Sequence, residues 1–190
     1  MNTGLFFGSF NPIHIGHLMI ANYILSFENL DSVCFVVSPQ NPLKDETILI
    51  SNHHRLKMVD IAIEKYNKLQ SSDIEFTMPK PSYTVDTLFK LRQQNPTINY
   101  SLITGEDNYE NFHKWKNYKT ILNNHKVIVY PRNRQPVKSK IKSDSFIISE
   151  APLIEISSTF IRESIKNNKN VEFMLPKGVY AYIIENNLYI

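Results

Sequence analysis

Short runs of apolar residues alternate along the chain with longer segments in which apolar side chains recur every three or four positions. The short runs are typical of buried strands, and the longer segments are typical of helices that pack on a sheet. We predict strands at 5–7, 33–37, 74–76, 100–103 and 127–129. This alternation favours an α/β fold of Rossmann type, an open parallel sheet with helices on both faces.

The segments between the runs place the first helices. One is expected to begin after His14 and another near residue 52. Their apolar stripes are Leu18, Ala21, Asn22 and Leu25 in the first, and Leu56, Val59, Ile63 and Tyr66 in the second. A third helix carries Leu88 and Leu91, and we predict that Thr84 caps it.

The second half of the chain repeats the theme with shorter elements. Short helical pieces are expected through Trp115 and Ile121, and two further helices begin near residues 158 and 177. The stretch 132–145 is polar and basic and has no apolar period, so it is predicted to be a surface loop.

Composition and charge narrow the class of protein. A length of 190 residues with 42% hydrophobic residues suits one domain, 1–190, with a sizeable core. The formal charge of +3 comes from scattered lysines, which suits phosphate-bearing small molecules and predicts no nucleic-acid partner. The stretch MNTGLFFGSF lacks the pattern of a secretory signal and no later run is apolar enough to span a membrane, so we expect a cytoplasmic protein. Cys34, the one cysteine, lies in a strand and is expected to be a buried thiol.

Glycine placement indicates where a ligand would bind. The chain has only five glycines, and Gly8, Gly16 and Gly105 fall at predicted ends of strands or starts of helices. Backbone without a side chain can approach a ligand closely at such points. Because the carboxyl ends of parallel strands border the ligand crevice of an open sheet, these positions predict a binding site.

The segment from Gly8 to His17 leads from the first strand into the first helix. His14 and His17 are three positions apart at the helix start, so both imidazoles can lie on one face beside unpaired backbone N–H groups. Such a helix start favours phosphate. The alternatives are a zinc pair, which lacks a neighbouring third ligand, and ordinary capping by polar residues.

A second helix start near the end of the chain has a similar character. Ser157, Ser158 and Thr159 are good capping residues, and Arg162 lies one turn further on, where its planar guanidinium can donate to phosphate oxygens. A plain capped helix with a solvent-facing Arg is the alternative. Two such helix starts in one α/β chain reinforce each other.

These two segments resemble the HxGH signature and the second motif of the nucleotidyltransferase superfamily. The segments 81–88, 105–108 and 112–115 are similar to bacterial nicotinate-mononucleotide adenylyltransferases, and the similarity covers nearly the whole chain. The resemblance implies transfer of AMP from ATP to nicotinate mononucleotide, which yields nicotinate adenine dinucleotide and pyrophosphate in NAD biosynthesis. ATP and nicotinate mononucleotide are then the expected partners.

The resemblance also implies roles for single residues. The catalytic residues would be His14, His17 and Arg162. The residues expected to bind ATP are Gly8, Ser9, Phe10, His14, His17, Gly105, Asp107, Ser158 and Arg162. The residues expected to bind the mononucleotide are Lys44, Tyr83, Thr84 and Trp115, with backbone N–H groups of Tyr83 and Thr84 on the nicotinate carboxylate and Trp115 on the pyridine ring. No metal ligand is expected in the protein, and Mg²⁺ would arrive with ATP.

Other interpretations stay open for several residues and for the function. Trp115 could instead be a packing anchor, and Asp107 could be a helix N-cap. We expect the polar segment His53, His54 and Arg55 to face solvent. The rival functions are pantetheine-phosphate adenylyltransferase, nicotinamide-mononucleotide adenylyltransferase and a nucleotide-binding sensor without catalysis. A homo-oligomer is possible.

Overall fold

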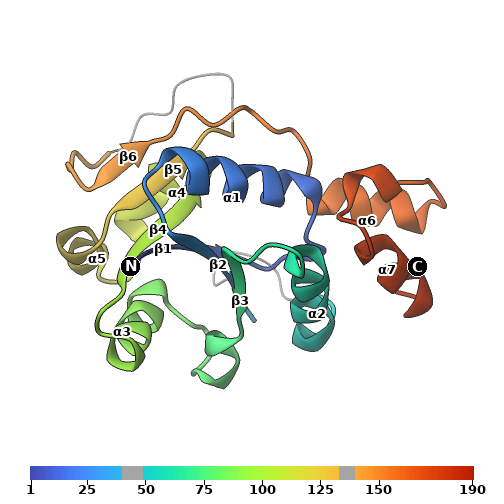
Figure 1. Ribbon diagram of the computed structural model, residues 1–190, viewed down its shortest axis with the longest axis horizontal. Helices are drawn as coiled ribbons and strands as arrows, with labels where there is room; N and C mark the ends of the chain where they lie inside the picture. The colour runs from blue at the N-terminus through green and yellow to red at the C-terminus, as the bar shows by residue number, and fades with distance from the viewer. Residues whose placement is uncertain (40–48, 133–139) are drawn as a thin grey trace.

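The computed structural model describes residues 1–39, 49–132 and 140–190 (Figure 1). Within these residues six parallel strands form one sheet in the order β3-β2-β1-β4-β5-β6. The strands are β1 (Asn2–Gly8), β2 (Ser32–Val37), β3 (Leu69–Ser72), β4 (Asn99–Gly105), β5 (Val127–Tyr130) and β6 (Phe146–Ile148). The chain order reverses between β1 and β4, which makes the carboxyl ends of these two strands the switch point of the sheet.

Helices follow most of the strands. They are α1 (Ile15–Phe27), α2 (Asn52–Ile63), α3 (Thr84–Gln94), α4 (Glu106–Asn111), α5 (Tyr118–Asn124), α6 (Ser158–Lys166) and α7 (Val179–Glu185). Short 3₁₀ turns are η2 (Ile74–Thr77), η3 (Phe112–Lys114) and η4 (Glu172–Met174). No helix in the described ranges is long and apolar enough to cross a membrane.

Strand side chains alternate between two buried clusters. Phe6 and Phe35 point into a cluster completed by α1, α2, α6 and α7, whereas their neighbours Leu5 and Cys34 point into a cluster completed by α3 and α5. Figure 1 shows α1 and α3 on opposite sides of the sheet. The period of two along β1 and β2 therefore buries both faces of the sheet there, and the predicted α/β fold of Rossmann type is confirmed.

The buried position of Cys34 in β2 is also confirmed. Burial raises the pKa of its thiol to about 12, so the group stays protonated at neutral pH.

The predicted third strand was placed wrongly. Residues 74–76 form the 3₁₀ turn η2, and the strand beside β2 is instead Leu69–Ser72. The sequence LQSS at the sheet edge is only partly buried, so it has no apolar run to mark it as a strand. Ile74, which carried the apolar signal, packs into the second cluster from the turn.

Two helix stripes are also corrected. The buried face of α1 is Gly16, Ile20, Ala21 and Ile24, and Asn22 is exposed, because the helix is rotated relative to the predicted stripe. Helix α2 ends at Ile63, so Tyr66 lies beyond it and is 55% exposed. Thr84 is not a cap: Tyr83 takes the N-cap position of α3, without a side-chain hydrogen bond, and Thr84 is the first helical residue.

Candidate functional site

A cavity of about 710 Å³ lies at the switch point of the sheet, where β1, β4 and β5 end. Every residue predicted to bind ATP lines it: Gly8, Ser9, Phe10, His14, His17, Gly105, Asp107, Ser158 and Arg162. We call this space the phosphate cavity, after the phosphate binding that the sequence predicts for its residues. Its size suits a small organic ligand. The structure thus brings together residues from the beginning, middle and end of the chain.

His14 is the N-cap of α1 and is only 5% exposed. Its Nδ1 atom is buried and has no hydrogen-bond partner among the residues that the structure describes. Burial, together with the positive charge of Arg132, lowers the pKa of His14 to about 4. The imidazole is therefore neutral at pH 7.

His17 lies in the first turn of α1 and stacks on His14, with 3.7 Å between the ring centroids. Its Nδ1 accepts a hydrogen bond of 3.2 Å from the backbone N–H of His14. An imidazole nitrogen that accepts carries no proton, so the neutral ring must hold its proton on Nε2. The backbone thus fixes the tautomer of His17, with the ring proton on Nε2.

The second motif is bonded directly to the first. The Ser158 hydroxyl donates to the carbonyl of Pro12 at 2.9 Å, and Nη1 of Arg162 donates to the carbonyl of Asn11 at 2.8 Å. From the C-terminal segment, the Tyr189 hydroxyl donates to the Asn11 side-chain oxygen at 2.9 Å. The start of α6, which Ser157 caps, is thereby fixed against the loop before α1. Two helix N-termini and their positive partial charge border one cavity.

Gly105 ends β4 under two polar side chains. A Cβ atom at this position would lie 2.6 Å from Oδ1 of Asp107 and 2.8 Å from Nε of Arg132. Glycine is therefore required for Asp107 and Arg132 to lie over the end of the strand. Gly105 is also the N-cap of α4, so the alternative interpretation of Asp107 as a cap is wrong, and Asp107 is the second residue of that helix.

Arg132 lines the phosphate cavity and was missed by the sequence analysis. Its Nη1 lies 3.6 Å from Oδ2 of Asp107, and its backbone N–H donates to the Glu106 carboxylate at 2.8 Å. The polar, basic residues from 132 onward predict a surface loop that begins at Arg132. Its position two residues after β5, at the same end of the sheet as Gly8 and Gly105, is the signal that could have found it.

Arg55 corrects the prediction of a solvent-facing segment at the start of α2. The side chain is fully buried, and its guanidinium donates to the carbonyls of Ser9, Ser38 (2.8 Å) and Pro39 (3.3 Å). Burial lowers its pKa to about 10, which leaves it charged at neutral pH. Because its acceptors follow β1 and β2, Arg55 holds together the loops at the carboxyl ends of both strands. The neighbouring His54 is half-buried and bonds to the Tyr182 hydroxyl.

The residues predicted to bind the mononucleotide lie apart from those predicted to bind ATP. Tyr83, Thr84 and Trp115 do not line the phosphate cavity, and Lys44 lies outside the described residues. Phe7 connects the two regions, since it lines the cavity and packs on the same cluster as Trp115. Trp115 stacks on Phe112 with centroids 4.7 Å apart, so one face of the indole is covered.

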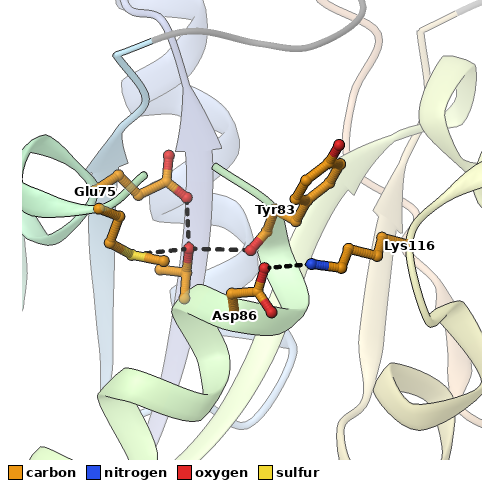
Figure 2. A network of polar contacts seen from close by, with 6 residues as sticks. Glu75, Tyr83, Asp86 and Lys116 are labelled. Atoms are coloured by element: carbon orange, nitrogen blue, oxygen red, sulfur yellow. Dashed lines mark hydrogen bonds and ion pairs between the residues drawn. The ribbon is translucent and has the colours of Figure 1, made fainter. Parts of the chain in front are cut away.

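Polar contacts hold the start of α3 (Figure 2). Glu75 is buried beneath it and accepts hydrogen bonds from Ser82 at 2.9 Å and Thr87 at 2.7 Å. On the outer side, Asp86 forms an ion pair of 2.9 Å with Lys116, the residue after Trp115. We call the set Tyr83, Thr84, Asp86, Trp115 and Lys116 the α3 group.

Comparison with known proteins shows the family of the chain. The cytidylyltransferase-like family model matches residues 5–164, a span that includes both helix starts of the phosphate cavity. A relative from Flavobacterium johnsoniae is 50% identical over 100% of this chain and 99% of its own, and one from Flavobacterium psychrophilum is 51% identical with the same coverage. Both are named "probable nicotinate-nucleotide adenylyltransferase". The chain belongs to this nicotinate-nucleotide adenylyltransferase family.

Among solved structures, the nicotinic acid mononucleotide adenylyltransferase of Plasmodium falciparum complexed with NaAD has a TM-score of 0.80. It is 21% identical, and the match covers 99% of this chain and 97% of that one. The fold of the nicotinate-nucleotide adenylyltransferase family therefore extends over the length of the chain at low sequence identity.

Proposed function

We propose that the chain transfers the AMP part of ATP to nicotinate mononucleotide, forming nicotinate adenine dinucleotide and pyrophosphate. The observation that carries this proposal is the phosphate cavity, where the His14 and His17 helix start is bonded to the Arg162 helix start. The names of the close relatives support this choice of reaction. So does the solved Plasmodium structure, whose ligand is NaAD.

The reaction in this proposal is a direct displacement. An oxygen of the mononucleotide 5′-phosphate attacks the α-phosphorus of ATP, and the bond from that phosphorus to the bridging oxygen of the β-phosphate breaks, so that pyrophosphate leaves with the electron pair. Catalysis of this kind depends on positioning and on stabilising charge. The Nε2–H of His17, the guanidinium of Arg162 and the N-termini of α1 and α6 would supply donors. No covalent enzyme intermediate is required.

Each arginine would have a distinct part. Arg162 keeps one nitrogen on the Asn11 carbonyl and another 3.3 Å from the Thr159 hydroxyl, so its remaining N–H groups are oriented before ATP binds. Arg132 lies 3.6 Å from Asp107 and would add a second positive charge to the cavity. Arg55 does not line the cavity; it would act by holding Ser9 in place.

Mg²⁺ would enter with ATP as part of the substrate. The described ranges contain no group of three His, Cys, Asp or Glu side chains that could hold a metal ion. In this proposal the ion neutralises charge on the phosphates, while the protein contributes the imidazole, guanidinium and backbone donors.

The cytoplasmic location of the protein also stays a prediction.

The test is pyrophosphate release from ATP by the purified protein. It should be measured with nicotinate mononucleotide, nicotinamide mononucleotide, phosphopantetheine and no acceptor, and the dinucleotide product identified by mass. We expect release with nicotinate mononucleotide at a rate far above the others. Dominant release with phosphopantetheine would replace the proposed substrate, and tight ATP binding without release in any arm would favour a nucleotide-binding sensor.

A further inference from the structure

Lys116 reaches from the turn after Trp115 to the first turn of α3. Its Nζ atom lies 2.9 Å from Oδ2 of Asp86 and 4.5 Å from the centroid of the Tyr83 ring (Figure 2). The two charged side chains come from segments 30 residues apart. The ammonium is thereby placed among the residues predicted to receive the pyridine ring and its carboxylate.

A role in folding does not account for this contact. The side chains of Lys116 and Asp86 are 45% and 47% exposed, and ion pairs at such positions add little to stability. Asp86 already lies in the first turn of α3, where the helix dipole favours a carboxylate. The ion pair therefore adds little to the stability of the fold, and its main effect is on the charge at the start of α3.

The charge at the start of α3 depends on Lys116. Backbone N–H groups there can receive an anion, but Asp86 presents a negative charge close by. Lys116 offsets that charge, and because an ammonium has three N–H donors, its bond to Asp86 leaves donors for another acceptor. Packing against the face of Tyr83 keeps the ammonium near one place.

We propose that Lys116 is a specificity-determining residue whose ammonium contacts the carboxylate of a pyridine-3-carboxylate substrate, with Asp86 holding the ammonium over Tyr83. The inference rests on the proposed function and adds the residue that favours the acid over the amide. A carboxylate gains a charge-assisted hydrogen bond from Lys116, whereas the neutral carboxamide gains much less. Without Lys116, Asp86 would repel the acid and leave the amide almost unaffected.

The experiment compares Lys116→Met and Lys116→Arg with wild type on nicotinate and nicotinamide mononucleotides at saturating ATP. Lys119→Met is the matched control, because Lys119 is an exposed lysine on the neighbouring helix α5. In Lys116→Met we expect kcat/KM for the acid to fall about 10-fold and that for the amide to change by less than about twofold. Lys116→Arg should keep most of the preference, and Lys119→Met all of it.

Salt gives a second readout, because attraction between partly exposed charges is screened. The acid-to-amide ratio should fall with added salt in wild type. In Lys116→Met it should not fall, because salt then screens the repulsion between Asp86 and the acid. An unchanged ratio in Lys116→Met, or an equal loss for both substrates, would overturn the role of Lys116 while the proposed function stands. A wild-type protein that turns over neither mononucleotide would overturn both.

Discussion

In the phosphate cavity, side chains are bonded to the backbone of neighbouring loops, whereas the α3 group is joined on its outer side by an ion pair between half-exposed residues. Arg162 and Ser158 donate to carbonyls of the loop before α1. Arg55, which is buried and does not line the cavity, donates to the loops after β1 and β2. Lys116 and Asp86 meet only through their side chains. The groups proposed to stabilise charge in the reaction are thus fixed in advance, and the groups proposed to select a substrate are held more loosely.

The difference predicts where substitutions cost rate and where they cost selectivity. Changes in the phosphate cavity should slow the reaction with every acceptor. Changes in the α3 group should alter acceptor binding and leave the use of ATP unchanged, and changes to its charged pair, Asp86 and Lys116, should alter the choice of acceptor. Each prediction below tests one side of this division.

The largest effect is expected for His17→Ala. The variant loses the Nε2–H donor whose tautomer the His14 backbone fixes, and turnover should fall roughly 10²- to 10³-fold, as is usual when one such donor is removed. Steady-state pyrophosphate release measures this loss. His53→Ala, at an exposed position of α2, is the control and should retain wild-type turnover. Near-normal turnover of a folded His17→Ala protein would remove His17 from the mechanism.

The next effect concerns the two mononucleotides. An amide presents a donor where α3 offers donors, and it lacks the full negative charge, so we expect nicotinate mononucleotide to be preferred by at least about 10²-fold in kcat/KM. Trp115→Ala should weaken both substrates similarly, because stacking does not distinguish acid from amide. Kinetics of the two substrates with wild type and this variant test the claim.

A control is needed because Trp115 also packs on the buried Phe112. Trp115→Phe keeps an aromatic ring there. Its kcat/KM should lie between those of wild type and Trp115→Ala for both substrates. Should the preference disappear with Trp115, discrimination would belong to the stacking residue, and the contrast between the two regions would need revision.

Sequence analysis found the part of the site that is local in the chain. His14 and His17 are three positions apart, and Gly8 and Gly105 end apolar runs, so pattern and spacing were enough. Lys116 and Asp86 could not be paired, because their contact depends on how α3 and the turn after Trp115 fold together. The same holds for Arg132, which enters the cavity because β5 lies beside β4.

Arg55 shows a different limit of sequence analysis. Its main acceptors are backbone carbonyls, which every residue type carries, so no side-chain pattern indicates them. A charged residue near a helix start is usually solvated, and only the three-dimensional arrangement of the loops makes this one buried. The polar edge strand β3 escaped prediction for a related reason: its partners are backbone groups of β2.

The stability of the fold should decrease at acid pH because of His14 in the phosphate cavity. The pKa of His14 is lowered by burial to about 4 from an ordinary 6.5, so between these values the unfolded chain binds a proton that the folded protein does not. Stability is therefore fully present above pH 6.5 and falls as the pH drops toward 4. From pH 7.5 to 5, His14 should lower the free energy of unfolding by about 2 kcal/mol. Urea unfolding of wild type and His14→Asn at both pH values measures this contribution.

The free energy of unfolding of His14→Asn should depend less on pH than that of wild type, by the contribution of His14, since asparagine does not titrate. Lys116→Met serves as the control from the α3 group and should retain the wild-type dependence. Identical pH dependence in wild type and His14→Asn would show that His14 is not held neutral by its surroundings.

The smallest expected effect is that of Arg162→Lys, which keeps the charge and removes the planar fork. Arg162 spans the Asn11 carbonyl and the Thr159 hydroxyl, and a lysine ammonium cannot hold both and still present N–H groups to phosphate in one plane. We expect KM for ATP to rise roughly 10-fold, with the ratio of acid to amide substrates unchanged. Arg92→Lys, at an exposed position of α3, makes the same chemical change away from the cavity and should leave KM for ATP as it is. Unaltered kcat and KM for ATP in Arg162→Lys would limit the role of Arg162 to joining α6 to the loop before α1. A changed preference for the acid over the amide would show that the two regions are coupled through that loop.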